Sequence, residues 1–246
     1  MPVLNYLLFF TVILLANIMQ GITGFAGTIL AMPFSLMLVG YPVAKPVLNV
    51  LGLLSGVYVF LEQKKQVQWK EVRTIVLIMA AGIFLGIYIK GLFAGREQFL
   101  IRALGVFVII LGLQGLIGRI RGKKNPMRPD HPLLYLILPL AGIVHGIFVS
   151  GGPLLISYLT RKLPDKNSFR ATISTVWIVL NSIVLIDDIR SGYWNPGLIG
   201  TLLIAVPFLL AAMKIGSILY HRMSQQVFMI LTYLLLAVSG VTLLLK

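Results

Sequence analysis

Two short glycine-rich stretches have residue types and spacing that could do chemistry. The first reads Gly21-Ile-Thr-Gly-Phe-Ala-Gly-Thr28, and the second reads Gly146-Ile-Phe-Val-Ser-Gly-Gly-Pro153. Glycine permits a positive φ and close approach to the backbone, and proline suits the first turn of a helix. Each stretch therefore predicts a helix that unwinds and restarts. The free N–H groups and positive dipole end of a restarted helix can bind an anion, or the glycines only let helices pack closely.

Polar residues in the surrounding apolar sequence extend this candidate site. His145 either carries a proton or donates to an anion, or it packs against a neighbouring carbonyl. Three polar residues on later apolar runs either complete the site or hydrogen-bond one helix to another. The expected anion-binding residues are Gly21, Gly24, Phe25, Gly27, Thr28, Asn49, His145, Gly146, Ser150, Gly151, Gly152, Ser174 and Asn181.

The elements that must position these residues are membrane helices. Of 246 residues, 58% are hydrophobic and 11% are charged, which is more apolar than a water-soluble domain of this size can hide. Runs of about 18 apolar residues can cross a hydrocarbon core of about 30 Å as helices, and they are continuously apolar, unlike barrel strands. The fold class is therefore an all-α integral membrane protein. Such runs cover 3–22, 43–61, 72–93, 98–118, 168–186, 198–220 and 225–245.

The net charge of +14 lies almost entirely in short loops. Membrane insertion keeps such basic loops in the cytoplasm, so the charge indicates topology and contact with anionic lipid, and no nucleic-acid partner is expected. The first run lacks a basic flank and a cleavage site, so we expect it to remain in the mature protein. The basic loop residues are Lys64, Lys65, Lys70, Arg73, Arg119, Arg121, Lys123, Lys124, Arg128, Arg161, Lys162, Lys166 and Arg170.

An internal repeat relates residues 125 positions apart, which we call repeat mates, from Ala16 to Gly91 without a gap. Trp69 matches Trp194, and Gly91 matches Gly216. The predicted domains are a first transmembrane repeat at 1–118, a basic cytoplasmic linker at 119–131 and a second repeat at 132–246. The charges of the loops predict that 132–160 leaves the cytoplasm and returns as a hairpin, either re-entrant or with two short crossings, followed by three spans. By the repeat, 3–39 forms the same hairpin.

An odd number of crossings per repeat would invert the halves relative to one another. Inverted repeats with broken helices are typical of secondary transporters, whose sites lie near the bilayer midplane. Lys45 and Arg170 are repeat mates at the starts of spans. They are either interfacial anchors or gates that attract an anion at opposite mouths.

Chemical groups and motifs that the sequence lacks exclude several classes of function. All seven acidic residues lie in loops or at span ends, so the interior offers no carboxylate for a cation, and we expect a small anionic solute as partner. No HExxH, P-loop or GxSxG signature occurs, and the sequence contains no cysteine. We therefore expect no enzyme activity, no metal site and no cofactor, and the oligomeric state is open.

Over nearly its whole length, the sequence resembles the sulfite exporter TauE/SafE family of membrane transporters. The resemblance rests on Gly21-x-x-Gly24-Phe25-x-Gly27 followed by Pro33, and on Gly146 with Ser150-Gly151-Gly152. It departs at Ala26, where the family pattern has glycine. The resemblance implies transport of sulfite, organosulfonates or related anions in a multi-pass protein of a prokaryotic cell membrane. Alternating access is the expected mechanism, with an anion channel and a non-transporting membrane scaffold as alternatives.

The inverted topology gives a labelling prediction, because the sequence has no native cysteine. Single cysteines at Gln68 and Tyr193 should react with a membrane-impermeant thiol reagent from opposite faces of the membrane. The measurement is labelling of intact cells and of inverted vesicles, with the cysteine-free protein as control. Labelling of both positions from one face would contradict the inverted repeats.

Overall fold

The structure, a computed structural model, describes residues 2–89, 133–148 and 151–244, with short stretches between 106 and 118. Within these ranges every regular element is helical, and four helices are long and apolar enough to cross a membrane. The all-α membrane fold is thus confirmed. The linker 119–131 and most of the run 98–118 lie outside the described residues. The helices are α1 (Pro2–Thr23), α2 (Ala26–Val39), α3 (Tyr41–Gln63), the 3₁₀ turn η1 (Lys64–Gln66), α4 (Trp69–Ile89), α6 (Leu133–Phe148), α7 (Gly152–Lys162), α8 (Lys166–Arg190), α9 (Pro196–Arg222) and α10 (Gln225–Leu244).

Local sequence sets several helix ends. Gly40 has a φ of +73°, and its N–H donates to the carbonyl of Leu36 at 3.1 Å, which ends α2. Pro42 then stands in the first turn of α3, where its missing N–H costs nothing. α9 begins with a side-chain cap, because Asn195 Oδ1 accepts from the N–H of Leu198 at 2.9 Å.

The described residues group into two compact units that differ from the two sequence halves. The first unit joins Met1–Val72 to Arg170–Met223, and the second joins Arg73–Phe169 to Ser224–Lys246. Each unit therefore combines helices from 1–118 with helices from 132–246. The halves are defined by similarity within the sequence, whereas the units are defined by contacts in the structure.

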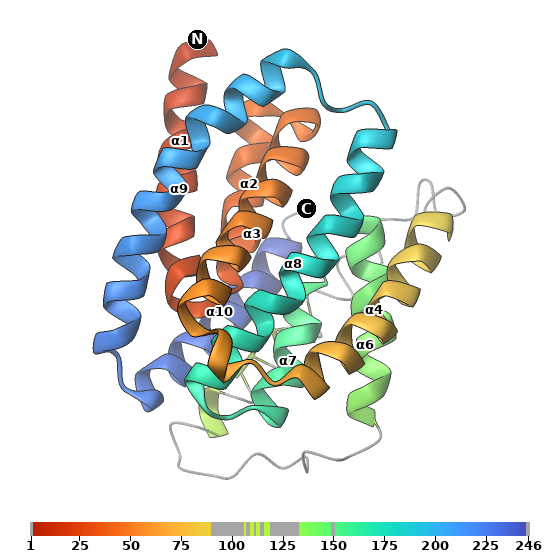
Figure 1. Ribbon diagram of the computed structural model, residues 1–246, viewed down its shortest axis with the longest axis vertical. Coiled ribbons are helices and arrows are strands. Elements are labelled where there is room, and N and C mark those ends of the chain that lie inside the picture. The colour runs from red at the N-terminus through yellow and green to blue at the C-terminus, as the bar shows by residue number, and fades with distance from the viewer. Residues whose placement is uncertain are drawn as a thin grey trace. The chain divides into compact units, whose positions relative to one another are not determined.

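The first unit is built around α1, which runs beside α9 (Figure 1). A buried apolar cluster fills the space between these helices, α2 and α3. Large apolar side chains on the outward faces, such as Leu7 on α1 and Leu203 on α9, are exposed, as expected of helices that face lipid. The cluster includes Phe9, Ile13, Leu48, Leu51 and Leu209.

Glycine allows α1 and α9 to cross at very short range. A Cβ atom on Gly21 would lie 3.0 Å from Gly216 Cα and 3.1 Å from the carbonyl oxygen of Met213. A Cβ on Gly216 would in turn meet the carbonyl of Ile18. Small residues at such crossings let backbones touch, which is how membrane helices gain packing energy.

The second unit contains the same kind of crossing, between α4 and α6. A Cβ atom on Gly86 would meet the backbone of Ile143, and one on Gly146 would meet the backbone of Ile83. The two α6 residues, Ile143 and Gly146, are the repeat mates of the two α1 residues in the first crossing. The α4–α6 and α1–α9 contacts are therefore equivalent.

This equivalence changes one detail of the repeat. Gly216 contacts α1 where Gly86 contacts α6, so the packing counterpart of Gly216 is Gly86. The sequence register had instead matched it to Gly91, which lies outside the described residues. The offset is thus 130 positions at this crossing. The register without gaps matches the tryptophans near the start of these helices. It does not include the shift in register that the packing shows further along them.

α3 and α8 pack antiparallel to one another. Near the start of α3, Lys45 forms an ion pair with Asp188 near the end of α8. At the other end of α3, Glu62 pairs with Arg170, with 3.0 Å between Nη1 and Oε2. Two ion pairs at opposite ends of the helix pair fix both its direction and its register.

The sequence repeat matches α3 with α8, so this pair consists of two helices that correspond to each other. Tyr41 and Lys166, the first residues of α3 and α8, are repeat mates. So are the two cations of the ion pairs, Lys45 and Arg170. The contact is therefore self-complementary in the way that a two-fold interface is.

The glycine crossing predicts a position-specific packing effect on α9. Gly216→Leu should lower the unfolding free energy of the detergent-solubilised protein by about 1–3 kcal/mol or more, because the new side chain would overlap α1. Thermal unfolding measures this effect. Gly200→Leu is the matched control, since a Cβ at Gly200 would have no atom within 4 Å. Equal effects of the two substitutions would contradict the close crossing.

Candidate functional site

The first glycine-rich stretch is a helix break, as predicted. α1 ends at Thr23, α2 begins at Ala26, and Gly24 between them has a φ of +82°. A Cβ atom there would lie 2.7 Å from Ser174 Oγ and 3.1 Å from the carbonyl oxygen of Arg170. Only glycine suits this position, because both the backbone conformation and the approach of α8 exclude a side chain.

The N–H groups at this break differ from the sequence expectation, because they already have partners. The N–H of Ala26 donates to Thr23 Oγ1 at 3.2 Å, and the N–H of Gly27 donates to Gln20 Oε1 at 2.8 Å. The N–H of Phe25 also reaches Thr23 Oγ1, at 3.4 Å. Free amides were thus the wrong expectation for residues 25–27. A buried break must satisfy its donors, and nearby polar side chains do so.

Gln20 and Thr23 were not among the predicted site residues. Both are polar residues at the end of an otherwise apolar helix, directly before the predicted break. Thr23 is fully buried, and Gln20 also donates from Nε2 to Ser55 Oγ at 2.9 Å. The signal that could have found them is a buried polar residue within reach of the restarted helix.

The carbonyl groups of the break are bound by α8. Arg170 donates from Nε to the carbonyl oxygen of Gly21 at 2.9 Å, and Ser174 donates from Oγ to that of Gly24 at 3.4 Å. The sequence allowed Arg170 a role as a gate at a mouth, and this stays a prediction. The structure places its guanidinium at the break formed by Gly21 and Gly24, where Ser174 also binds.

Arg170 is the largest fully buried side chain of the described residues. Its Nη1 donates to Glu62 at 3.0 Å, and its guanidinium lies 4.3 Å from the ring centroid of Tyr220. Nη2 is buried without a hydrogen-bond partner. A buried donor without an acceptor is destabilising, so this nitrogen is suited to a ligand with an acceptor oxygen.

A second group of predicted residues lies between α2, α3 and α8. A Cβ atom on Gly52 would lie 2.8 Å from Asn181 Nδ2 and 3.4 Å from Thr28 Oγ1. Asn49 donates from Nδ2 to the carbonyl of Asn181 at 3.1 Å, and its Oδ1 is buried without a partner. Gly27, one residue before Thr28, packs against α1. The structure therefore brings Thr28, Asn49 and Asn181 together.

The ion pair at the far end of α3 involves Lys45. Its side chain is 6% exposed, its Nζ lies 5.4 Å from the ring centroid of Tyr193, and Asp188 is fully buried. Of the acidic residues that the structure describes, Asp165 lies between α7 and α8 and the others lie near helix ends, as expected. Burial of Asp188 was not foreseen, because its cationic partner is 143 positions away in the sequence.

The second break lies in the other unit and differs in detail. α6 ends at Phe148, and α7 begins at Gly152 with Gly151 as its N-cap. A Cβ atom on Gly151 would lie 2.8 Å from His145 Cβ, and His145 is itself buried. Ser150 lies outside the described residues.

Gly146 and Gly152 have different surroundings at this break. Gly146 takes part in the crossing with α4, which is a packing role, and Gly152 is buried at the start of α7. The described residues thus place the predicted site residues in three groups, one at each break and one between α2, α3 and α8.

Comparison with known proteins decides the family. The model of the family described as "Sulfite exporter TauE/SafE" matches residues 9–243. The chain belongs to the TauE/SafE sulfite exporter family. This TauE/SafE chain is also 27% identical over 122 residues to "Probable inner membrane transporter protein TsaS" of Comamonas testosteroni. That match spans 49% of this chain and 48% of the relative. No solved structure matches the chain.

The family match and the four long apolar helices together identify a multi-pass membrane protein of a family described as sulfite exporters. Among the described residues, the buried cation at the first break is then the strongest candidate contact for an anion.

The geometry of the first break predicts that substitution of Gly24 lowers the free energy of unfolding more than substitution of another glycine with a positive φ. Gly24→Ala should combine about 1–2 kcal/mol of left-handed strain with the clash against Ser174 Oγ. Gly192→Ala is the matched control, since Gly192 has a φ of +73° and open space around it.

Thermal unfolding of the two variants in detergent compares these costs. The double variant Gly24→Ala with Ser174→Ala should recover part of the extra loss, because it removes the closest atom. Equal stability of the Gly24→Ala and Gly192→Ala proteins would contradict the contact with α8.

Proposed function

We propose that this protein transports sulfite or organosulfonate anions by alternating access, and that Arg170 binds the anion at the first helix break. The observation that carries the proposal is the fully buried guanidinium whose Nη2 lacks a hydrogen-bond partner. An arginine buried in a membrane protein is expensive and is typical of a substrate pathway.

The guanidinium suits this class of anion. Its planar fork donates parallel hydrogen bonds to oxyanions, which a lysine ammonium cannot do in the same geometry. Sulfite and sulfonate groups each carry three acceptor oxygens, so one anion can accept from Nη2 and still reach neighbouring donors. Ser174 Oγ, one helical turn further along α8, is a hydroxyl at the break.

In this proposal the N–H groups of the break are further hydrogen-bond donors for the anion. Those of Ala26 and Gly27 are held by the side chains of Thr23 and Gln20. A side chain can rotate away when a stronger acceptor arrives, and an anion is a stronger acceptor than a hydroxyl or an amide. In this proposal the break exchanges internal bonds for bonds to the anion.

Alternating access rests on the relation between α3 and α8. These helices occupy the same place in the two sequence repeats yet pack antiparallel, which is the relation expected of inverted repeats. Each end of the pair carries one ion pair. We infer that the two ion pairs act as gates, one at each mouth, and open in turn.

The substrate class comes from the family description, sulfite exporter. The name of the relative describes a membrane transporter and does not state which solute it carries. A carboxylate offers two acceptor oxygens where a sulfonate offers three, so acetate should be the weaker substrate.

Uptake into proteoliposomes tests the proposal. Sulfite and methanesulfonate should enter with saturable kinetics and exchange with unlabelled anion, and acetate should enter more slowly. Arg170→Lys should weaken the apparent affinity by about tenfold or more, because hydrogen bonds to charged groups contribute about 1.5–3 kcal/mol.

Arg190→Lys is the matched control, since it makes the same change on an exposed residue of the same helix. Flux that does not saturate and shows no exchange would favour a channel. Absence of flux for every anion, in protein shown to be folded, would refute the transport of these anions.

A further inference from the structure

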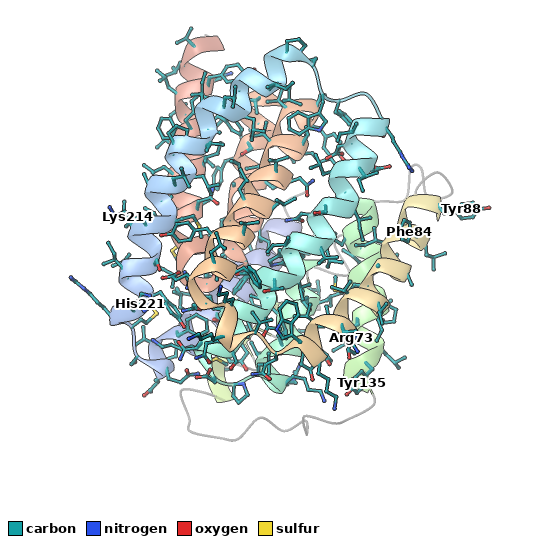
Figure 2. All side chains as sticks on the ribbon, viewed as in Figure 1. Arg73, Phe84, Tyr88, Tyr135, Lys214 and His221 are labelled. Atoms are coloured by element: carbon teal, nitrogen blue, oxygen red, sulfur yellow. The ribbon has the colours of Figure 1, made fainter. Side chains whose placement is uncertain are left out.

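Arg170 is shared between the helix break and an internal anion. The carboxylate of Glu62 accepts from Arg170 Nη1 at 3.0 Å, contacts His221 Nε2 at 2.8 Å and accepts from Ser217 Oγ. His221 lies in the last turn of α9 (Figure 2). Glu62 therefore joins α3 to both α8 and α9 at one end of the first unit.

An incoming anion at Arg170 would meet this carboxylate. Two negative charges that share one guanidinium repel each other, and the repulsion is strong because Arg170 is fully buried. The repulsion disappears when the carboxylate, or the imidazole bonded to it, takes up a proton. Anion binding at Arg170 and proton binding at Glu62 are then linked.

His221 supplies a proton acceptor in the right place. An imidazole ring nitrogen can take up and release a proton. The side chain of His221 is 59% exposed and that of Glu62 is 26% exposed, whereas Arg170 has none of its side chain exposed. Protons can thus reach the pair from water while Arg170 faces the break.

The other titratable groups that the structure describes at this end are two tyrosines and two lysines. Tyr220 of α9 and Tyr58 of α3 face the guanidinium. Lys64 and Lys65 follow Glu62 in the chain and are exposed. Glu62 and His221 are the acid and the base that contact each other here.

The opposite end of the helix pair has no histidine among its described contacts. Lys45 pairs with Asp188, and the groups around them are Tyr41, Tyr193 and Asp187. Among the contacts that the structure describes, the imidazole is therefore found at the Arg170 end.

Building on the proposed function, we propose that Glu62 and His221 form the proton-binding pair of this transporter. In this step Arg170 Nη1 leaves Glu62 for the substrate anion, and one proton from water binds the Glu62–His221 pair. When the anion leaves on the other side of the membrane, the proton leaves to the water of that same side, and Glu62 pairs with Arg170 again. One proton accompanies each monovalent anion, so transport is proton-coupled.

Proteoliposomes loaded with a pH dye test this inference with methanesulfonate, which stays a monovalent anion across the pH range used. An inwardly directed proton gradient should drive accumulation of methanesulfonate by the wild-type protein, with about one proton entering per anion. Apparent affinity should rise as pH falls, by at most about tenfold per pH unit for one linked proton.

Two variants separate coupling from folding. Glu62→Gln and His221→Gln should each remove most of the dependence of transport on the proton gradient, whereas Glu62→Asp should retain it because a carboxylate remains. His221→Gln changes a largely exposed side chain and so keeps the test valid where Glu62→Gln fails to fold. Arg222→Gln, an exposed neighbour of His221, is the matched control and should behave as wild type.

The outcomes distinguish this inference from the transport function. Saturable methanesulfonate flux without proton entry, or full proton coupling in both glutamine variants, would overturn the proton pair and leave the transport of anions intact. No flux of methanesulfonate or sulfite by folded wild-type protein would overturn both.

Discussion

The first helix break depends on one constraint: every buried backbone group that the interruption frees must find a partner. α1 provides these partners for the amides through Gln20 and Thr23, and α8 provides them for the carbonyls through Arg170 and Ser174. The same bonds that permit the break therefore attach α8 to α1. A ligand that accepts from the amides of Ala26 and Gly27 must replace their bonds to Thr23 and Gln20, whereas a ligand at Arg170 Nη2 meets a donor without a partner among the described residues.

The helix pair α3–α8 extends that attachment along the first unit. A buried ion pair contributes little net stability, because desolvation offsets most of the attraction, but loss of one partner is costly. Lys45–Asp188 and Arg170–Glu62 thus favour one register over others more than they strengthen the fold. Between them, Gly56 lets the backbone of α3 approach that of α8, and Gly52 leaves room for the Asn181 side chain. Asn49 also donates to the carbonyl of Asn181, so the helix pair is joined at its centre as well as at its ends.

Much of the fold could be predicted because it follows from local sequence. Continuous apolar runs gave the helices, and glycine with positive φ gave the break at Gly24. The partners of the break could not be predicted in the same way. Arg170 meets a carbonyl 149 positions away and a carboxylate 108 positions away, and no local pattern encodes such pairs. Sequence reasoning also treated the amides as free, since it considered the ligand before the protein's own side chains.

The two sequence repeats differ in side-chain chemistry, and in the proposed mechanism this difference gives transport a direction. Gln20 at the first break corresponds to His145 at the second, and Arg170 corresponds to Lys45. At one end of α3–α8 an arginine pairs with a carboxylate that also contacts a histidine; at the other a lysine pairs with a buried aspartate. Two proposed gates of identical chemistry would respond equally to a proton and would give a proton gradient nothing to act on. Among the contacts that the structure describes, an imidazole occurs at the Arg170 end alone, so a proton bound there would change the stability of that proposed gate and not of the other.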